Sequence, residues 1–268
     1  MTMNSLFLIA GNGDYPRLVV ESARVAGVRR VVMASFEGET LPTSEALADE
    51  VCRMKVGQLG KLLEAAKKSG ATQAIMAGQI APGNLFALRP DFRALMILAR
   101  LKERNAETLF GAVATELAAV GIELLPATTF LENHLATKGH LAGPRLKARH
   151  VADLEFGFQI AKASSRMDIG QTVVVKNGTV LAVEAFEGTD EAIRRGGKLG
   201  RKGALVIKVS KPGQDMRFDV PIVGPRTLEI ATEARILAIG VEAGATLLLD
   251  REKVAADARD RAIALYGL

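Results

Sequence analysis

Short apolar runs alternate with amphipathic stretches through the first half of the chain, and this alternation is its strongest constraint on the fold. The apolar runs predict strands at residues 6–10, 28–34, 51–56, 74–77 and 122–125. The stretches between them have the period of helices that bury one face, at residues 18–26, 58–69, 92–104 and 107–120. Alternating strands and helices predict an open, mostly parallel sheet that binds its ligands at the carboxyl ends of the strands.

The second half has a different organisation. Residues 131–150 lack periodicity and predict a hinge between an N-terminal domain at 1–130 and a C-terminal domain at 151–268. Asn177 and Gly178, set between β-branched runs, predict a hairpin. Further elements are expected as helices at 151–165, 190–195, 227–238 and 251–264 and as strands at 205–210 and 247–249. The predicted fold class is α/β, with an open parallel-sheet domain followed by a distinct α/β (α+β) domain.

The composition indicates where the protein is located and which kinds of partner it can bind. The single cysteine, Cys52, excludes an internal disulfide and a thiolate metal cluster. No apolar run approaches the roughly 20 residues that cross a bilayer, and the start lacks a signal peptide's basic and apolar regions. We therefore expect a cytoplasmic protein. The net charge of +5 favours anionic partners, but no stretch mixes basic and aromatic residues as nucleic-acid binding would need.

Two glycine-rich loops follow predicted strands of the first half. Residues 11–16 (GNGDYP) resemble half of a dinucleotide fingerprint, in which glycines let the backbone approach a phosphate at a helix N-terminus. Pro16 stands where a third glycine is expected, which argues against a dinucleotide. Residues 78–83 form the second loop, and an ordinary turn is the alternative reading for both. The candidate binding residues are Gly11, Asn12, Gly13, Asp14, Tyr15, Gly78 and Gln79.

Carboxylates crowd two loops of the second half, at Glu184, Glu187, Asp190, Asp215 and Asp219. Such groups are costly to bury unless solvent, a metal or a phosphate-bearing ligand uses them. Mg²⁺ needs only one or two carboxylates beside phosphate oxygens and water, so these loops predict a magnesium site, with Asp219, Asp215 and Glu184 as candidate ligands. A remaining carboxylate can deprotonate the attacking water. The alternative for Glu187 and Asp190 is capping of the helix that follows.

Basic residues flank these loops. Arginine binds phosphate through two parallel hydrogen bonds, but for most of these side chains we expect a solvated surface. They are Lys138, Arg145, Lys147, Arg149, Arg194, Arg195, Lys198, Arg201 and Lys202.

Four stretches together resemble the LpxI-type UDP-2,3-diacylglucosamine pyrophosphatases of lipid A biosynthesis. They are residues 11–16, 168–175, 184–190 and 211–221, in the family's order along the whole chain. The resemblance implies Mg²⁺-dependent hydrolysis of UDP-2,3-diacylglucosamine to UMP and 2,3-diacylglucosamine 1-phosphate (lipid X). It also implies a Rossmann-like N-terminal domain, lipid held between two domains, and one essential aspartate in residues 214–221. Asp219 and Asp215 both remain candidates.

With this family in view, the acidic loops gain further candidate substrate-binding residues, namely Glu187, Gly188, Thr189, Asp190, Lys211 and Gln214. The basic charge suits an enzyme that collects its UDP-linked acylated glucosamine from the anionic inner face of the cell membrane without spanning it. A homo-oligomer is left open. Two other functions also remain open: a nucleotide-dependent oxidoreductase that uses residues 11–16, and a non-catalytic UDP-lipid binding protein.

Overall fold

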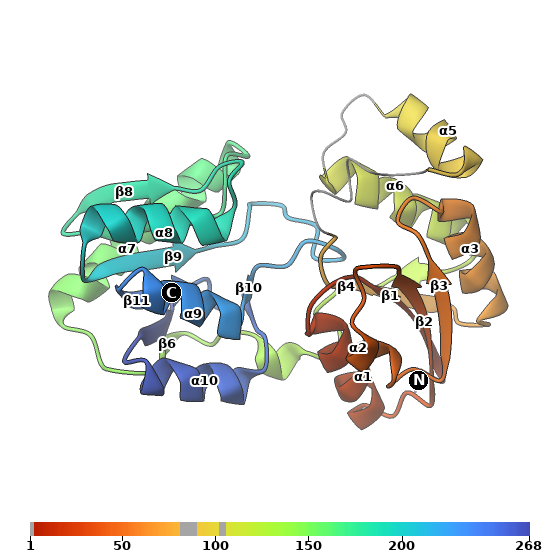
Figure 1. Ribbon diagram of the computed structural model, residues 1–268, viewed down its shortest axis with the longest axis horizontal. Helices are drawn as coiled ribbons and strands as arrows, with labels where there is room; N and C mark the ends of the chain where they lie inside the picture. The colour runs from red at the N-terminus through yellow and green to blue at the C-terminus, as the bar shows by residue number, and fades with distance from the viewer. Residues whose placement is uncertain (1–2, 81–89, 102–105) are drawn as a thin grey trace. The chain divides into compact units, whose positions relative to one another are not determined.

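The computed structural model describes residues 3–80, 90–101 and 106–268. The chain divides into two compact units (Figure 1). Unit 1 comprises Met1–Glu132 and Asp215–Asp219, and unit 2 comprises Asn133–Gln214 and Val220–Leu268. The chain therefore passes between the units at three points, after residues 132, 214 and 219.

Unit 1 contains a five-stranded sheet with every neighbouring pair parallel. Its strands are β1 (Ser5–Ala10), β2 (Arg30–Phe36), β3 (Glu50–Met54), β4 (Gln73–Ala77) and β5 (Glu123–Leu124). Their order is β3-β2-β1-β4-β5, so the sheet winds outward in both directions from β1 and β4. This confirms the predicted open parallel sheet. A reversal of strand order between two central strands is where such sheets bind ligands.

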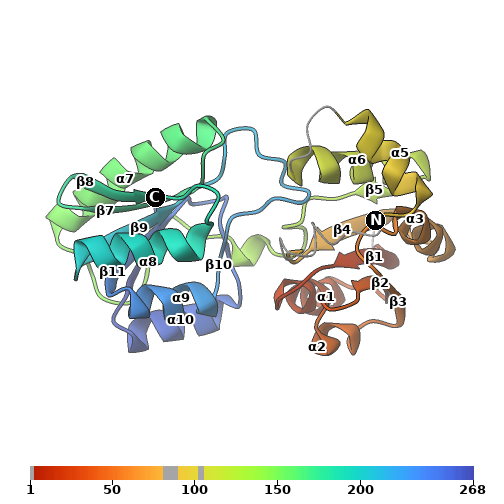
Figure 2. The ribbon, with the colours of Figure 1, turned by 45° about the horizontal axis from the view of Figure 1, so that its top comes forward.

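Helices cover both faces of this sheet, with α1 and α2 on one face and α3 and α6 on the other (Figure 2). The described helices of unit 1 are α1 (Tyr15–Val25), α2 (Pro42–Glu45), α3 (Leu59–Lys68), α5 (Phe92–Arg100) and α6 (Ala106–Ala119). Phe7 and Val32 of the sheet pack with Leu62 of α3 and Leu117 of α6 in one buried cluster. Aliphatic burial of this kind stabilises the unit without tryptophan. Residues 102–104 of the predicted 92–104 helix lie outside the described residues.

Unit 2 is built on a six-stranded mixed sheet, ordered β6-β13-β11-β9-β7-β8. The strands are β6 (Gly139–Ala142), β7 (Thr172–Lys176), β8 (Thr179–Val183), β9 (Ala204–Lys208), β11 (Ile236–Val241) and β13 (Ala264–Gly267). The predicted hairpin is confirmed, because β7 and β8 pair antiparallel across Asn177 and Gly178. A separate parallel pair is formed by β10 (Ile222–Val223) and β12 (Leu247–Leu248).

The side chains of this sheet alternate between two cores. Val173 and Val175 face the core shared with α7 (Ala148–Arg166), whereas Val174 faces the opposite core. The opposite core is closed by α8 (Thr189–Gly200), α9 (Pro225–Glu233) and α10 (Arg251–Asp260). Figure 2 shows α7 on one face of the sheet and these three helices on the other.

The structure corrects three helix boundaries in unit 2. The helix predicted at 227–238 ends at Glu233, and the apolar residues after it form the buried strand β11. The helix predicted at 251–264 ends at Asp260, before β13. The helix predicted at 190–195 instead runs from Thr189 to Gly200, because its glycines pack tightly on neighbouring segments. A Cβ on Gly196 would lie 2.4 Å from Cβ of Val174.

The segment predicted as a hinge, residues 131–150, contains regular structure. It holds the 3-10 turn η1 (Glu132–His134), strand β6 and the first residues of α7. Because β6 pairs with β13, the four residues Gly139–Ala142 of this segment are part of the unit 2 sheet. Among the described helices, none has the length and apolar character that crossing a bilayer demands.

Candidate active site

Two loops of unit 1 meet where the central strands β1 and β4 end. The backbone N–H of Gly11 donates to the carbonyl of Ala77 at 2.8 Å, and Asn12 and Gln79 exchange two backbone hydrogen bonds at 2.7 and 3.2 Å. The residues of these loops that the structure describes end at Ile80, so the rest of the predicted 78–83 loop lies outside the described residues. The two glycine-rich loops, which were predicted separately, therefore form one surface where the strand order reverses between β1 and β4.

Glycine is required at both contact points. A Cβ on Gly11 would lie 2.5 Å from the carbonyl oxygen of Gln79, closer than any real side chain approaches. Gly78 has a φ of +94°, and a Cβ there would lie 2.7 Å from the carbonyl oxygen of Asn12. Gly13 also has a positive φ but has no atom within 4 Å of its Cβ position. Gly11 and Gly78 thus hold the two loops together, and Gly13 leaves open space at the loop's tip.

Helix α1 begins directly behind this loop, and no side chain of the described residues caps its N-terminal end. Asp14 occupies the N-cap position but makes no side-chain hydrogen bond to the helix, and Pro16 fills the first turn. The uncapped N–H groups and the helix dipole favour an anion at this end. Arg17, in the first turn, pairs with Glu21 at 2.8 Å and lies 3.9 Å from Asp14.

Tyr15 holds the glycine loop in place. Its side chain is buried, and its hydroxyl donates to the carbonyl of Ala127 at 2.6 Å. Burial raises the pKa of the Tyr15 hydroxyl, so it stays protonated at neutral pH. Because that proton is committed to Ala127, the hydroxyl fixes the loop against the chain that follows β5.

A buried carboxylate that the sequence analysis did not single out, Glu39, lies beyond the end of β2. Its exposed fraction is 2%, and it accepts a hydrogen bond from the Asn12 amide at 3.4 Å. The neighbouring Thr40 hydroxyl donates to the carbonyl of Ala10 and accepts from the N–H of Phe36 at 2.9 Å. An acid shortly after the second strand of such a sheet is the signal that could have identified Glu39.

The segment Asp215–Asp219 belongs to unit 1, although the sequence places it deep in the second half. The N–H of Ala127 donates to the carbonyl of Met216 at 2.8 Å. The ring of Phe218 lies 5.7 Å from that of Phe110, centre to centre, and packs on the unit 1 core. Ala127 therefore contacts the glycine loop through its carbonyl and the acidic segment through its N–H.

Asp215 and Asp219 occupy one turn but have different environments. The carbonyl of Asp215 accepts the N–H of Asp219 at 3.0 Å. The Asp215 carboxylate binds the Arg217 guanidinium at 2.9 and 2.6 Å, and this hydrogen bonding lowers the pKa of Asp215. The side chain of Asp219 is exposed. Asp215 is thus an ionised carboxylate that Arg217 anchors, and Asp219 is the more exposed of the two residues.

Gln214 and Lys211 precede this turn in unit 2. The Gln214 side-chain oxygen accepts the N–H of Lys211 at 2.6 Å, and the ammonium of Lys211 pairs with Asp168 at 2.9 Å. In the part of the chain that the structure describes, the buried Nε2 of Gln214 has no hydrogen-bond acceptor. A buried amide without a partner is costly, and a ligand oxygen would satisfy it.

The carboxylates of residues 184–190 are each engaged separately in unit 2. Glu184 accepts the Thr189 hydroxyl at 2.9 Å and the N–H of Gln171 at 3.3 Å. Arg195 binds Glu187 and lowers the pKa of that carboxyl.

Asp190, in the first turn of α8, pairs with Arg226 at 2.9 Å, and Gly188 is the N-cap of this helix. Within residues 3–80, 90–101 and 106–268, no three His, Cys, Asp or Glu side chains gather as metal ligands. The magnesium site stays a prediction.

The order of the unit 1 sheet and its paired glycine loops define a two-domain α/β protein with a Rossmann-like N-terminal domain. Residues 5–134 match the LpxI N-terminal domain, and residues 137–266 match the LpxI C-terminal domain. The chain belongs to the LpxI family. A relative from Caulobacter vibrioides, named UDP-2,3-diacylglucosamine pyrophosphatase LpxI, is 32% identical over 279 residues, covering 99% of this chain and 98% of the relative.

Similarity to solved structures is weak. The biotin carboxylase subunit of pyruvate carboxylase is 15% identical, with a TM-score of 0.27 over 64% of this chain and 34% of that one. The biotin carboxylase domain of a single-chain bacterial carboxylase is 15% identical, with a TM-score of 0.29 over 63% and 36%. The chain spans about a third of the length of these structures, and likeness at this level carries no functional argument.

Proposed function

We propose that this chain hydrolyses the pyrophosphate bond of UDP-2,3-diacylglucosamine, giving UMP and 2,3-diacylglucosamine 1-phosphate for lipid A biosynthesis. Membership of the LpxI family and the name of the Caulobacter vibrioides relative support this substrate. The observation that carries the proposal is the position of Asp215–Asp219. This acidic turn belongs to the same unit as the glycine loops and is joined to Tyr15 through Ala127.

In the proposed reaction, the oxygen of a water molecule bonds to one phosphorus while the bridging P–O bond breaks. The displaced phosphate oxygen leaves with the electron pair of that bond. The uncapped N-terminal end of α1 is suited to bind the diphosphate before and during the step. A carboxylate takes the proton of the attacking water and releases it to solvent.

We assign the role of base or ligand to Asp219 and a positioning role to Asp215. The Asp215 carboxylate is held by Arg217, and its carbonyl accepts the N–H of Asp219, so Asp215 fixes the turn. The exposed Asp219 carboxylate is accessible to water and substrate.

The acidic turn suits Mg²⁺, because Asp219 and Asp215 offer carboxylate oxygens, which hard cations prefer. The third candidate, Glu184, belongs to unit 2 and binds Thr189 and Gln171 there. When bound, Mg²⁺ would neutralise the diphosphate and polarise its phosphorus–oxygen bonds. Asp215 would need to share its carboxylate with Arg217 to serve as a ligand. Asp219 is the more exposed of the two aspartates.

The test is to incubate the protein with UDP-2,3-diacylglucosamine, Mg²⁺ and ¹⁸O-labelled water and to follow UMP. We expect Asp219→Asn to abolish turnover while the fold is retained, and Asp215→Asn to lower it less. Asp260→Asn, at an exposed site at the end of α10, is the control and should behave as wild type. Wild-type rates in both Asp219→Asn and Asp215→Asn would refute the assignment.

The same experiment separates the other two functions. A non-catalytic UDP-lipid binding protein would retain the substrate and release no UMP with any divalent metal. A nucleotide-dependent oxidoreductase would bind a nicotinamide cofactor in a fluorescence titration. The carboxylates of Asp215–Asp219 favour hydrolysis, since neither alternative needs them.

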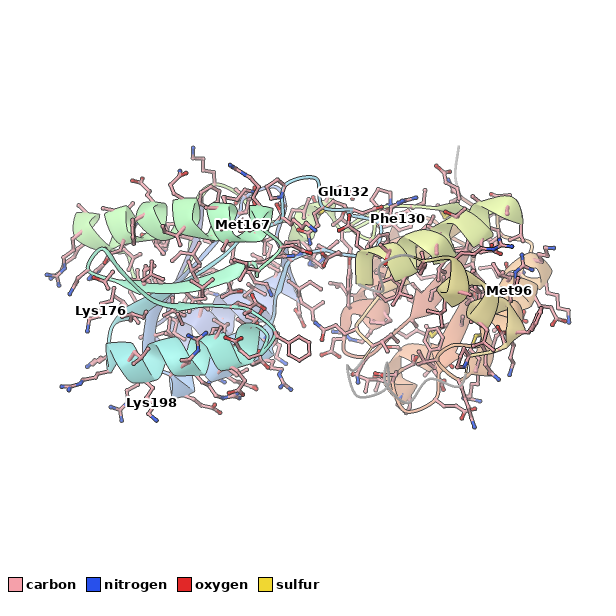
Figure 3. The ribbon with its side chains drawn as sticks, turned by 90° about the horizontal axis from the view of Figure 1, so that it is seen from above. Met96, Phe130, Glu132, Met167, Lys176 and Lys198 are labelled. Carbon is pink, nitrogen blue, oxygen red and sulfur yellow. The ribbon has the colours of Figure 1, made fainter. Side chains whose placement is uncertain are left out.

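We also propose that the protein acts in the cytoplasm, in peripheral contact with the inner face of the membrane. The net charge of +5 supports attraction to an anionic surface. Helix α5 adds exposed apolar side chains, with 79% of Phe92, 51% of Leu95 and 42% of Met96 accessible (Met96 is labelled in Figure 3). Apolar and basic residues together on one helix suit attachment to lipid headgroups without insertion. Homo-oligomerisation remains a prediction.

A further inference from the structure

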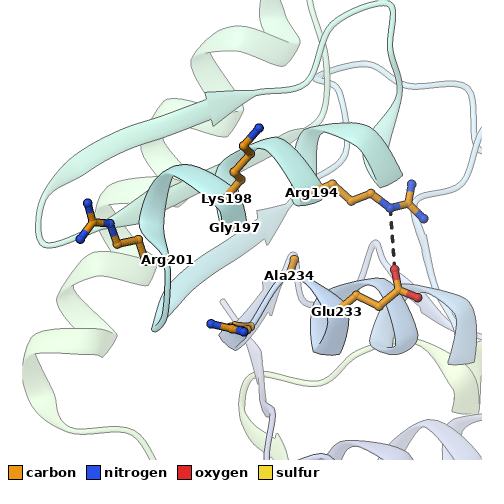
Figure 4. A pocket seen from close by; sticks show the side chains of 7 residues that line it. Arg194, Gly197, Lys198, Arg201, Glu233 and Ala234 are labelled. Atoms are coloured by element: carbon orange, nitrogen blue, oxygen red, sulfur yellow. Dashed lines mark ion pairs between the residues drawn. The ribbon is translucent and has the colours of Figure 1, made fainter.

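A basic pocket lies on unit 2 between α8 and the junction of α9 with β11 (Figure 4). Its volume is about 550 Å³, within the usual range for small-ligand sites. The residues that line it are Arg194, Gly197, Lys198, Arg201, Glu233, Ala234 and Arg235. None of these has been given a role in the proposed hydrolysis.

The floor of the pocket is a close contact between backbone segments. A Cβ on Gly197 would lie 2.4 Å from the carbonyl oxygen of Ala234, so α8 lies directly against the end of α9. The N–H of Gly203 donates to the carbonyl of Arg235 at 3.1 Å and ties the far end of the pocket. The basic side chains therefore project from a rigid base.

The charge of the pocket is strongly positive. Four basic side chains accompany one carboxylate, Glu233. Arg194 pairs with Glu191 at 2.5 Å and lies 3.8 Å from Glu233 (dashed line in Figure 4).

The other three cations, Lys198, Arg201 and Arg235, have no carboxylate within 4.0 Å among the residues that the structure describes. A concave site with several uncompensated cations concentrates anions, and guanidinium groups match phosphate oxygens in pairs.

Two of these arginines occupy backbone conformations that side chains rarely adopt. Arg201 has φ +61° and ψ −65°, and the N–H of Lys202 donates to the carbonyl of Gly200 at 2.8 Å. This is a γ-turn of the strained kind. Arg235 has φ +53° where α9 ends. Glycine would fit both positions at lower cost, so guanidinium groups there suggest a function for the side chain.

We propose that this pocket binds a phosphate-bearing anion, at a site separate from Asp215–Asp219 and from the glycine loops. The recognised chemistry is a phosphate group with two or more accessible oxygens, contacted by Arg201, Arg235 and Lys198. Such a group can come from a soluble phosphate compound or from the headgroup of an anionic phospholipid. The proposal does not depend on the hydrolytic activity.

The test compares two probes, inorganic pyrophosphate in calorimetry and vesicles of phosphatidylglycerol, with phosphatidylcholine vesicles as the blank. The variants are Arg201→Gly, Arg235→Ala and Lys198→Ala. Lys253→Ala, which removes an exposed charge from α10, is the control. We expect each pocket variant to weaken binding of at least one probe by about tenfold or more, as loss of a charged hydrogen bond does. Lys253→Ala should leave both affinities unchanged.

The pattern of losses identifies the source of the phosphate. Weaker pyrophosphate binding with unchanged vesicle binding indicates a soluble compound, whereas weaker vesicle binding indicates a headgroup. Attachment of vesicles through α5 would not respond to the pocket variants.

Two further variants separate binding from folding. Arg201→Gly relieves the strained turn, so its Tm should not fall below that of wild type. Glu233→Gln removes the opposing charge and should tighten binding of the same probe. If pocket variants bind both probes as wild type does, or if wild type binds neither, the proposal is overturned.

Discussion

Replacing Gly11 by alanine tests whether contact between the β1 and β4 loops holds the candidate site together. The new Cβ would lie 2.5 Å from the carbonyl oxygen of Gln79, whereas ordinary contact begins at 3.4 Å. The loops must separate by the difference, 3.4 minus 2.5, or 0.9 Å. That shift takes the Asn12–Gln79 bonds, now 2.7 and 3.2 Å long, out of hydrogen-bonding range.

The cost follows from these contacts. Two backbone hydrogen bonds at about 0.5–1.5 kcal/mol each contribute about 1–3 kcal/mol. Overpacking against a backbone adds about 1–3 kcal/mol. We therefore expect Gly11→Ala to destabilise unit 1 by about 2–6 kcal/mol. Gly13→Ala, with a positive φ but nothing within 4 Å, should cost only about 1–2 kcal/mol.

The assay is urea denaturation of both variants, with hydrogen exchange of peptides from residues 6–18 to report on the loop itself. Exchange at Asn12 should accelerate in Gly11→Ala and stay near wild type in Gly13→Ala. If Gly11→Ala is no more destabilising than Gly13→Ala, the two loops do not depend on close contact.

Two further perturbations probe the acidic turn and its attachment. Tyr15→Phe leaves the carbonyl of Ala127 without its donor and should cost about 1–3 kcal/mol in urea denaturation; an unchanged midpoint would contradict this. Arg217 holds the pKa of Asp215 below its usual range. This pair therefore stabilises the fold fully at pH values above the ordinary carboxyl pKa of about 4. The stabilisation is lost as the pH falls through the lower pKa of the folded state. Asp215→Asn should therefore show a smaller fall of Tm in acid than wild type, and equal falls would argue against it.

The sequence predicted unit 1 well because each of its signals is local. A strand such as residues 5–10 is a short apolar run that ends in a glycine turn and precedes an amphipathic helix. Unit 2 was harder because α9 passes into β11 without a glycine or proline as a stop signal. Arg235 follows that helix in a left-handed backbone conformation, which an arginine in the sequence does not predict. The central strand β11 was consequently predicted in part as helix.

In the candidate site, too, the sequence predicted local features but not the contacts between residues far apart in the chain. Glycines at residues 11 and 78 predicted two loops at strand ends, and the structure brings them into contact. The assignment of Asp215–Asp219 to unit 1 depends on Phe218 packing on Phe110 and on the backbone of Ala127, which no local pattern reveals. Glu39 was missed because its significance lies in burial beside Asn12.

The placement of Asp215–Asp219 in unit 1 limits how this chain can be divided. A fragment cut after residue 132 would lack both aspartates and would uncover the surface of Phe110 that Phe218 normally covers. Neither half of the gene would then encode a complete domain. Recombination that exchanged only one half would combine the glycine loops of one protein with the Asp215–Asp219 turn of another. Substitutions in that turn must therefore stay compatible with the surface of the first 132 residues as well as with the residues next to it in sequence.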